Sequence, residues 1–179
     1  MALVLNGSGS ITGLSAGGLP DGSVTADDIA STLDLSGKTV TLPSGTGGKV
    51  LQVVQSNFTG NSSTTSTSVQ TLFSASITPS SASNKVLAMV TTLGYCNGHN
   101  NALAVRLYRG TISDTQIANT YVEDGGNSYE TYNFALNKLD SPSTTSAQTY
   151  TVGYSQSQAI YANMNYYSTS TLILMEIAA

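Results

Sequence analysis

The stretch Val69-Gln-Thr-Leu-Phe-Ser-Ala-Ser-Ile-Thr78 sets the pattern for the C-terminal part of the chain. Its residues fall into two alternating series, one ending at Ile77 and largely apolar, the other ending at Thr78 and mostly polar. Successive side chains of an extended strand point to opposite faces, so this alternation predicts a β-strand with one buried and one solvated face. The same alternation recurs at residues 103–108 and 149–154, which are predicted as strands on the same ground.

Working outward from this stretch, the pattern predicts eight strands and a ninth that ends the chain. They lie at about 49–57, 68–78, 85–95, 102–109, 115–122, 129–137, 147–156, 159–167 and 170–178. Turn-forming sequences such as Asn97-Gly98 and Asp140-Ser-Pro142 separate them. The Ser- and Thr-rich stretch 61–68 is interpreted as a mobile loop. Many short strands without intervening helices are typical of an antiparallel sandwich or jelly roll, so the predicted fold class is all-β.

Two of the predicted strands are apolar on both faces. They cover residues 85–93 and 170–177. A strand with two apolar faces either lies centrally in a structure or packs against a second chain. The sequence leaves both alternatives open.

The first 48 residues differ from the rest because they hold 10 of the 17 glycines, with single apolar residues between them. Glycine raises the entropy lost on ordering, so such a segment does not fold alone. It is interpreted either as an arm that orders when it docks on a partner, or as a flexible linker. The candidate anchors of the arm are Leu3, Leu5, Ile11, Leu14 and Leu19.

Within this segment a short helix is predicted near residues 25–35, followed by a connector strand at 38–42. Thr25 caps the helix, and Asp27 and Asp28 lie in its first turn, where the helix dipole favours negative charge. The predicted organisation is therefore an extended N-terminal attachment arm, 1–48, and a β-sandwich head, 49–179.

Composition narrows the class of function. The chain has 50 Ser and Thr residues among 179, against 6 basic and 10 acidic residues and a net charge of −4. Nucleic-acid binding needs clustered Lys and Arg, so it is not expected. The single cysteine, Cys96, forms no intrachain disulfide. No apolar run approaches the roughly 18 residues of a membrane-spanning helix, so the prediction is cytoplasmic synthesis without membrane insertion.

No motif predicts catalysis or metal binding. His99 and Cys96 would suit a base and a nucleophile, but no supporting motif accompanies them, and a loop histidine with a buried cysteine is preferred. Glu123 and Asp124 offer oxygens to a hard cation, yet they fall short of a calcium loop, and a solvated turn is preferred. The sequence therefore predicts no enzyme and no catalytic, cofactor-binding or metal site.

Tyrosine is the more informative residue type, because all ten tyrosines lie at or after Tyr95. Tyr and Asn combine flat contact area with adaptable hydrogen bonding, which is typical of binding surfaces and suits sugars. The alternative is that these side chains pack within the sheets or between subunits. The residues predicted for surface recognition are Tyr95, His99, Tyr129, Tyr132, Tyr161, Asn163 and Tyr166.

Several stretches resemble virion fibre and decoration proteins of tailed bacteriophages, especially marine and cyanobacterial ones. The resemblance begins in Leu3-Val-Leu-Asn-Gly-Ser-Gly-Ser-Ile-Thr-Gly-Leu-Ser15, Leu19-Pro-Asp-Gly-Ser-Val24 and the connector Lys38-Thr-Val-Thr-Leu-Pro-Ser44. It continues through Gly48-Lys-Val-Leu-Gln-Val-Val54, Ser76-Ile-Thr-Pro-Ser-Ser-Ala-Ser-Asn-Lys-Val-Leu87 and Val105-Arg-Leu-Tyr-Arg-Gly110. It ends with Leu139-Asp-Ser-Pro-Ser-Thr-Thr-Ser-Ala-Gln-Thr-Tyr-Thr-Val152 and Ser170-Thr-Leu-Ile-Leu-Met-Glu-Ile177, so it covers nearly the whole chain.

The resemblance implies a jelly-roll-like head that forms a homotrimer and an N-terminal segment that attaches to the particle. With only about 48 residues before the head, it favours a capsid decoration (cement) protein or a short head fibre on the virion surface. The implied partners are other copies of the chain and a particle protein such as the major capsid protein or a tail component. The alternative is a tail fibre, a receptor-binding protein whose head recognises a host surface polysaccharide.

Overall fold

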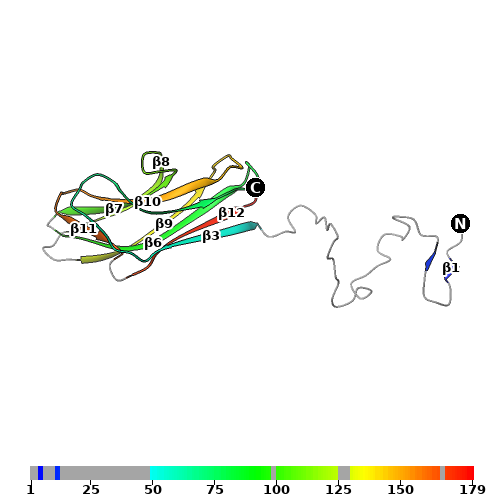
Figure 1. Ribbon diagram of the computed structural model, residues 1–179, viewed down its shortest axis with the longest axis horizontal. Helices are drawn as coiled ribbons and strands as arrows, with labels where there is room; N and C mark the ends of the chain where they lie inside the picture. Colours follow the sequence, from blue (N-terminus) through cyan, green and yellow to red (C-terminus); the bar gives the residue numbers. More distant parts are fainter. Residues whose placement is uncertain (1–3, 6–10, 13–48, 98–99, 125–129, 166–167) are drawn as a thin grey trace. The chain divides into compact units, whose positions relative to one another are not determined.

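The structure is a computed structural model, which describes residues 4–5, 11–12, 49–97, 100–124, 130–165 and 168–179 (Figure 1). Near the N-terminus, strands β1 (Val4–Leu5) and β2 (Ile11–Thr12) pair antiparallel, with Leu5 opposite Ile11. The helix predicted at 25–35 and the strand predicted at 38–42 lie outside the described residues. So do the predicted site residues Leu3, Leu14, Leu19, His99, Tyr129 and Tyr166.

One sheet of the head is built around the long strand β6 (Lys85–Asn97), and we call it the β6 sheet. Strand β9 (Glu130–Asp140) pairs along one edge of β6. The other edge is shared by two strands that lie end to end, β12 (Ser170–Ile177) and β11 (Tyr161–Met164). Strand β3 (Val50–Phe58) pairs with β12, and all of these pairings are antiparallel.

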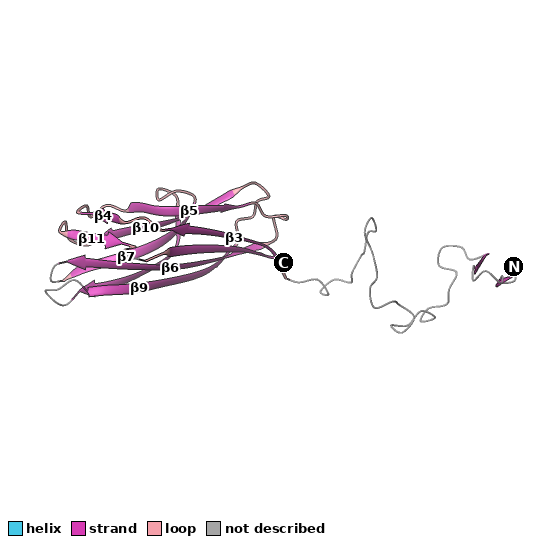
Figure 2. Cartoon of the chain, turned by 60° about the horizontal axis from the view of Figure 1, so that its bottom comes forward, coloured by secondary structure: helices cyan, strands magenta, loops and turns pink. Residues whose placement is uncertain are grey.

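The second sheet, which we call the β7 sheet, has the strand order β5-β10-β7-β8 and is also antiparallel. Its strands are β5 (Gln70–Ile77), β10 (Gln148–Gln156), β7 (Asn101–Arg109) and β8 (Thr115–Asp124). In Figure 2 every described element of the head is drawn as a strand or a loop. The alternating sequence produces this arrangement because each strand has one apolar face to bury.

The chain changes sheet at six of the nine connections from β3 to β12, and the connections β3–β4, β7–β8 and β11–β12 stay within one sheet. As a result, strands that are distant in sequence become neighbours, as β3 and β12 do. The six-stranded β6 sheet and the four-stranded β7 sheet joined in this way form a β-sandwich. The predicted fold class, an all-β antiparallel sandwich, is confirmed, and none of the described residues is helical.

The sequence prediction was wrong in two places. Residues 61–68 were assigned to a loop, but Ser62–Thr64 form strand β4, which pairs with β11. A strand made only of Ser and Thr has no alternation of apolar and polar residues. Because this strand is held by backbone pairing, the sequence does not predict it. The strand predicted at 159–167 is also shorter, because the described strand is Tyr161–Met164.

The core lies between the inner faces of the two sheets. Val86, Ala88 and Val90 of β6 face it, and Tyr150 and Tyr154 of β10 are buried there as well. The rings of Phe58 and Phe73 stack with their centroids 6.0 Å apart and so join the two sheets. Two buried carboxylates, Glu176 and Asp140, lie on either side of Val86 in one cross-strand row of the β6 sheet.

Candidate functional site

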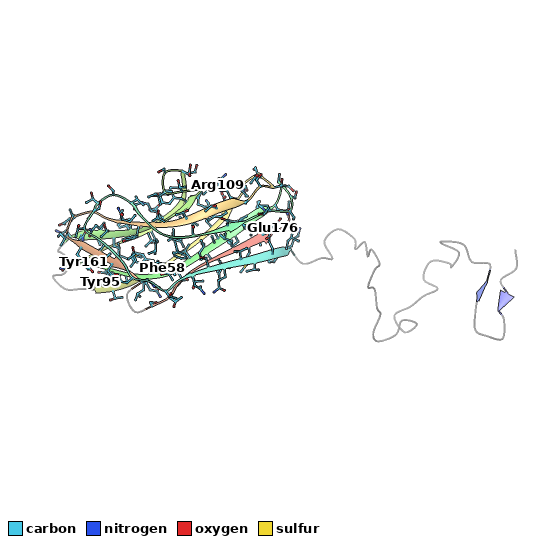
Figure 3. The ribbon with its side chains drawn as sticks, viewed as in Figure 1. Phe58, Tyr95, Arg109, Tyr161 and Glu176 are labelled. Atoms are coloured by element: carbon cyan, nitrogen blue, oxygen red, sulfur yellow. The ribbon has the colours of Figure 1, made fainter. Side chains whose placement is uncertain are left out.

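Three of the residues predicted for recognition lie together on the β6 sheet. The rings of Tyr95 on β6 and Tyr161 on β11 are 6.0 Å apart and tilted by 45°. The side-chain amide of Asn163 donates a hydrogen bond to the Tyr161 hydroxyl at 3.3 Å. The two tyrosines lie at the end of the head opposite the C-terminus (Figures 1 and 3). The structure therefore brings these residues into one cluster.

Their burial is uneven. Asn163 is only 2% exposed, and its Oδ1 has no hydrogen-bond partner. Tyr132, from β9, packs against the core from inside the sandwich. Tyr95 and Tyr161 are half-buried. A role in recognition stays a prediction for these residues, and the tyrosine pair offers the larger accessible area.

The outward face of the β6 sheet is unusually poor in charge. Val53, Met175, Leu87 and Leu139 occupy one row that crosses four neighbouring strands. Val53 is 57% exposed and Leu139 is 49% exposed, while the two residues between them are half-buried.

The next row places Ile173 beside Met89. Among the described strands of this sheet, Lys85 is the one charged residue whose register position falls on the outward face. We call this surface the uncharged face.

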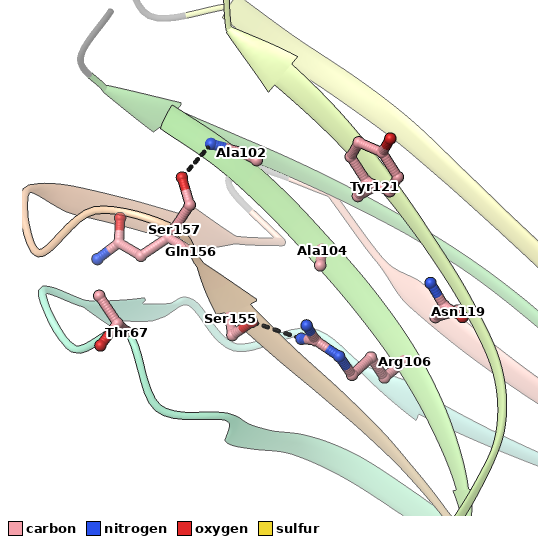
Figure 4. A pocket seen from close by; sticks show the side chains of 9 residues that line it. All are labelled: Thr67, Ala102, Ala104, Arg106, Asn119, Tyr121, Ser155, Gln156 and Ser157. Atoms are coloured by element: carbon pink, nitrogen blue, oxygen red, sulfur yellow. Dashed lines mark hydrogen bonds between the residues drawn. The ribbon is translucent and has the colours of Figure 1, made fainter. Parts of the chain in front are cut away.

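The outward face of the β7 sheet carries a groove of about 410 Å³ (Figure 4). Its floor is low because Ala102 and Ala104 occupy successive outward positions of β7. Tyr121 of β8 lies across from Ala104 and is 65% exposed, so its ring forms one wall. Arg106 lies farther along β7 and reaches toward Ser155 of β10, to which it donates a hydrogen bond. The lining is completed by Thr67, Asn119, Gln156 and Ser157.

A buried amide network holds one end of this groove. Gln156 donates to the carbonyl oxygen of Thr64 at 3.1 Å and accepts from the side-chain amide of Asn101 at 3.1 Å. Ser157 accepts a hydrogen bond from the backbone N–H of Ala102 at 2.8 Å. These bonds tie β10 to β7 and to the last residue of β4. The wall of the groove is therefore set before any ligand arrives.

Sequence reasoning missed this groove. The alternation of Ala104 and Arg106 with buried leucine and valine predicted the strand, but it does not predict the walls that make a groove. The depth depends on the height of Tyr121 and of the segment around Thr67, which come from other parts of the chain. The one available signal was a pair of alanines at successive outward positions, Ala102 and Ala104, followed by an arginine.

The remaining chemical candidates contribute little. The Cys96 thiol is buried and donates to the Asn101 carbonyl oxygen at 3.3 Å. Glu123, at the end of β8, is exposed. Among the described residues, no group of three His, Cys, Asp or Glu side chains is placed to hold a metal ion. In the same part of the chain, no helix has the length and apolar character needed to cross a membrane.

Comparison with known proteins gives matches in structure but none in sequence. No protein-family model matches the chain, and a search of curated proteins found no match. The chain is similar to one in infectious bursal disease virus, Gx strain, with 12% identity and a TM-score of 0.44, covering 79% of this chain and 41% of that one. A chain of the T13 particle of the same virus gives 15% identity and a TM-score of 0.44, with coverages of 79% and 40%.

A third match is to Bacillus endospore appendages, described as disulfide-linked pili. It has 13% identity and a TM-score of 0.33, covering 78% of this chain and 100% of that one. The chain spans about two fifths of the length of the two viral chains. At these identities and TM-scores, the matches carry no conclusion about function.

Proposed function

We propose that the chain is a virion structural protein of a tailed bacteriophage, a homotrimeric capsid decoration (cement) protein or short head fibre. It has no enzymatic activity, its β-sandwich head lies on the virion surface, and its N-terminal arm attaches it to a particle protein. The observation that carries the proposal is the uncharged face of the β6 sheet. The sequence resemblance to fibre and decoration proteins is the reason for proposing a phage virion as the particle.

The uncharged face suits contact with protein better than contact with water. Interface cores are depleted of charge and enriched in methionine. Among its described residues, this face has Lys85 as its one charge and carries Met89 and Met175. Burying an exposed valine or leucine side chain contributes about 1.5–3 kcal/mol, so the row from Val53 to Leu139 offers a substantial driving force. The sequence left open whether residues 85–93 lie centrally or against a second chain. In the head they lie centrally, and their outward face remains for that second chain.

A second copy of the chain is the partner that this face fits best. Charged residues on a surface that binds a second copy of the same chain can repel one another. With Lys85 as the one charge described on this face, little repulsion is expected. A strongly acidic or basic partner would find nothing here to pair with. The polar edge of the tyrosine cluster lies toward the other end of the sheet and stays open to solvent.

The geometry of the head also supports attachment through the arm. The backbone N–H of Ala178 donates to the carbonyl oxygen of Lys49 at 2.7 Å, and the Lys49 ammonium group donates to the Ala179 carbonyl oxygen at 3.3 Å. The chain therefore enters the head beside its C-terminus, at the end opposite Tyr95 and Tyr161 (Figure 3). Three arms linked through one trimer would act together, which makes weak single contacts durable.

The uncharged face predicts a specific assembly defect. The double substitution Val53→Lys and Leu139→Lys places two charges on exposed positions, where the fold of one subunit tolerates them. We expect light scattering to give about three times 18.5 kDa for the natural chain and 18.5 kDa for the variant. The control is Ser74→Lys, on the exposed face of β5, which should leave the mass unchanged. A monomeric natural chain, or an assembled double variant, would contradict the proposal.

The arm predicts a loss of particle binding. A chain without residues 1–20 lacks the anchors Leu3, Leu5, Ile11, Leu14 and Leu19. We expect the shortened chain to form the same oligomer as the natural chain. We also expect it to stop cosedimenting with phage particles that lack the protein. Circular dichroism checks that the head remains folded. Undiminished cosedimentation of the shortened chain would show that attachment does not use the arm.

A further inference from the structure

We propose that the groove on the β7 sheet binds a saccharide that carries a carboxylate group, with Arg106 contacting the carboxylate and Tyr121 contacting the apolar face of the ring. This inference does not depend on the assembly role, because the groove lies on the opposite sheet from the uncharged face. It places recognition away from the tyrosine cluster that the sequence predicts.

Arg106 has donors to spare. A guanidinium group has five N–H donors, and the hydrogen bond that Arg106 donates to Ser155 uses one of them. Within the described part of the chain, the one ion pair joins Arg109 and Asp140, so Arg106 has no carboxylate partner there. It is half-buried along the groove, where its charge is less screened than on an open surface. A planar carboxylate matches the guanidinium fork in shape and charge.

The charge pattern limits the ligand to isolated negative groups. Arg106 is the one charged residue among those that line the groove. Glu123 pairs with Ala102 in the ladder and marks the far end of the same outward face, about 13 Å along β7 from Arg106. A nucleic acid or a densely sulfated polymer would meet this carboxylate and find too few cations. A sugar chain with one carboxylate near Arg106 and neutral rings beyond it avoids that conflict.

The rest of the lining suits a sugar. The exposed ring of Tyr121 offers a flat apolar surface with a hydroxyl at its edge, as amphipathic binding sites commonly do. Asn119 and Ser157 add amide and hydroxyl groups that match sugar hydroxyls in hydrogen-bonding character. The floor of alanine methyl groups lets a ring lie close to the sheet (Figure 4). The volume, about 410 Å³, is within the range of small-ligand sites.

The experiment is binding of the labelled full chain to an array of uronate-containing oligosaccharides and their neutral counterparts. We expect the chain to bind uronate-containing sugars in preference to the neutral ones, and the best of them is then titrated in solution. Arg106→Gln should weaken that binding about 10- to 100-fold, the range for losing a charge-assisted hydrogen bond pair. Tyr121→Ala should weaken it about tenfold, and because the residue is exposed the variant is expected to fold normally.

Two controls separate this site from the others. Tyr161→Ala alters the tyrosine cluster and should leave the affinity unchanged. The double variant Val53→Lys and Leu139→Lys should bind the sugar with the same affinity per head and lose only the gain from multivalency. Failure of the assembly proposal would therefore change the oligomeric mass without changing the affinity of a single head. Equal binding of neutral and uronate sugars, full binding by Arg106→Gln, or loss of binding in Tyr161→Ala would each overturn the inference.

Discussion

Replacing Glu176 by alanine is expected to lower the free energy of unfolding by about 3–5 kcal/mol, because it breaks a hydrogen-bond network around a buried carboxylate. Its side chain is 1% exposed, on the inner face of β12. One carboxylate oxygen accepts from the backbone N–H of Ser80 at 2.6 Å, the Ser80 hydroxyl at 2.7 Å and the Asn84 amide at 2.6 Å. The other accepts from the Gln52 amide at 2.7 Å. Truncation removes the acceptor from all four donors. The Asn84 side chain is buried, whereas Gln52 also donates to the Thr78 carbonyl oxygen.

Urea denaturation of the natural chain and the variant measures this loss. The control is Glu123→Ala, which removes an exposed carboxylate and should change the stability by less than about 0.5 kcal/mol. A Glu176→Ala variant as stable as the control would mean that water replaces the carboxylate as acceptor for the four donors at no cost. The expected site of weakening is the end of the head where Gln52 of β3 meets the turn before β6, since the carboxylate joins those segments.

The same carboxylate predicts how stability depends on pH. Burial by itself raises the pKa of Glu176, but the hydrogen bonds from Asn84, Gln52 and Ser80 outweigh it and lower the pKa from 4.5 to about 2. A carboxyl group whose pKa is lower in the folded state stabilises the fold at pH values above its pKa in the unfolded chain. That contribution is lost as the pH falls toward the pKa of the folded state. The natural chain should therefore lose stability between pH 4.5 and about pH 2. In Glu176→Gln this part of the loss should be absent.

Asp140→Ala is expected to have an effect of similar size, about 3–5 kcal/mol. The Tyr150 hydroxyl donates to the Asp140 carboxylate at 2.8 Å, and the Arg109 Nε lies 3.1 Å from the same oxygen. The arginine contact is an ion pair without the alignment of a hydrogen bond. Tyr150 is buried, and burial together with the nearby carboxylate raises its pKa, so the phenol remains a donor. Removing Asp140 leaves a buried hydroxyl and a cation without their acceptor.

The comparison with Tyr150→Phe tests this explanation. That substitution keeps the aromatic ring and the Arg109–Asp140 pair, so it should cost about 1.5–3 kcal/mol, the value of one hydrogen bond to a charged group. The double variant should then be little worse than Asp140→Ala alone, because both changes remove the same contact. Fully additive losses would show that the tyrosine and the aspartate stabilise the head independently.

Much of the head could be predicted from its sequence, because strands with one buried face carry a period of two in their residues. The segment around Phe73 and the segment around Val105 were located by this period alone. Strand β4 could not be found, since Ser62–Thr64 has no apolar series and is held by pairing with β11. The strand order was also beyond reach, because β3 and β12 become neighbours only through the path of the chain between the two sheets.

The candidate sites divide in the same way. The gathering of tyrosine and asparagine late in the chain indicated Tyr95 and Tyr161, which the fold brings together. The inward direction of Tyr132 and the burial of Asn163 depend on strand register and on neighbouring strands. A shift of one residue in register would turn Tyr132 to the outward face, and the sequence carries no independent record of that register.

By itself, then, the sequence determined the class of structure: strands with one apolar face, a polar surface almost without charge, and a glycine-rich segment ahead of the head. These properties are local, since they follow from the order of residue types along each strand. Only the tertiary structure decided which outward faces exist. The row from Val53 to Leu139 and the groove lined by Thr67, Arg106 and Ser155 each combine residues from segments far apart in sequence. Such surfaces arise only when those segments are set side by side.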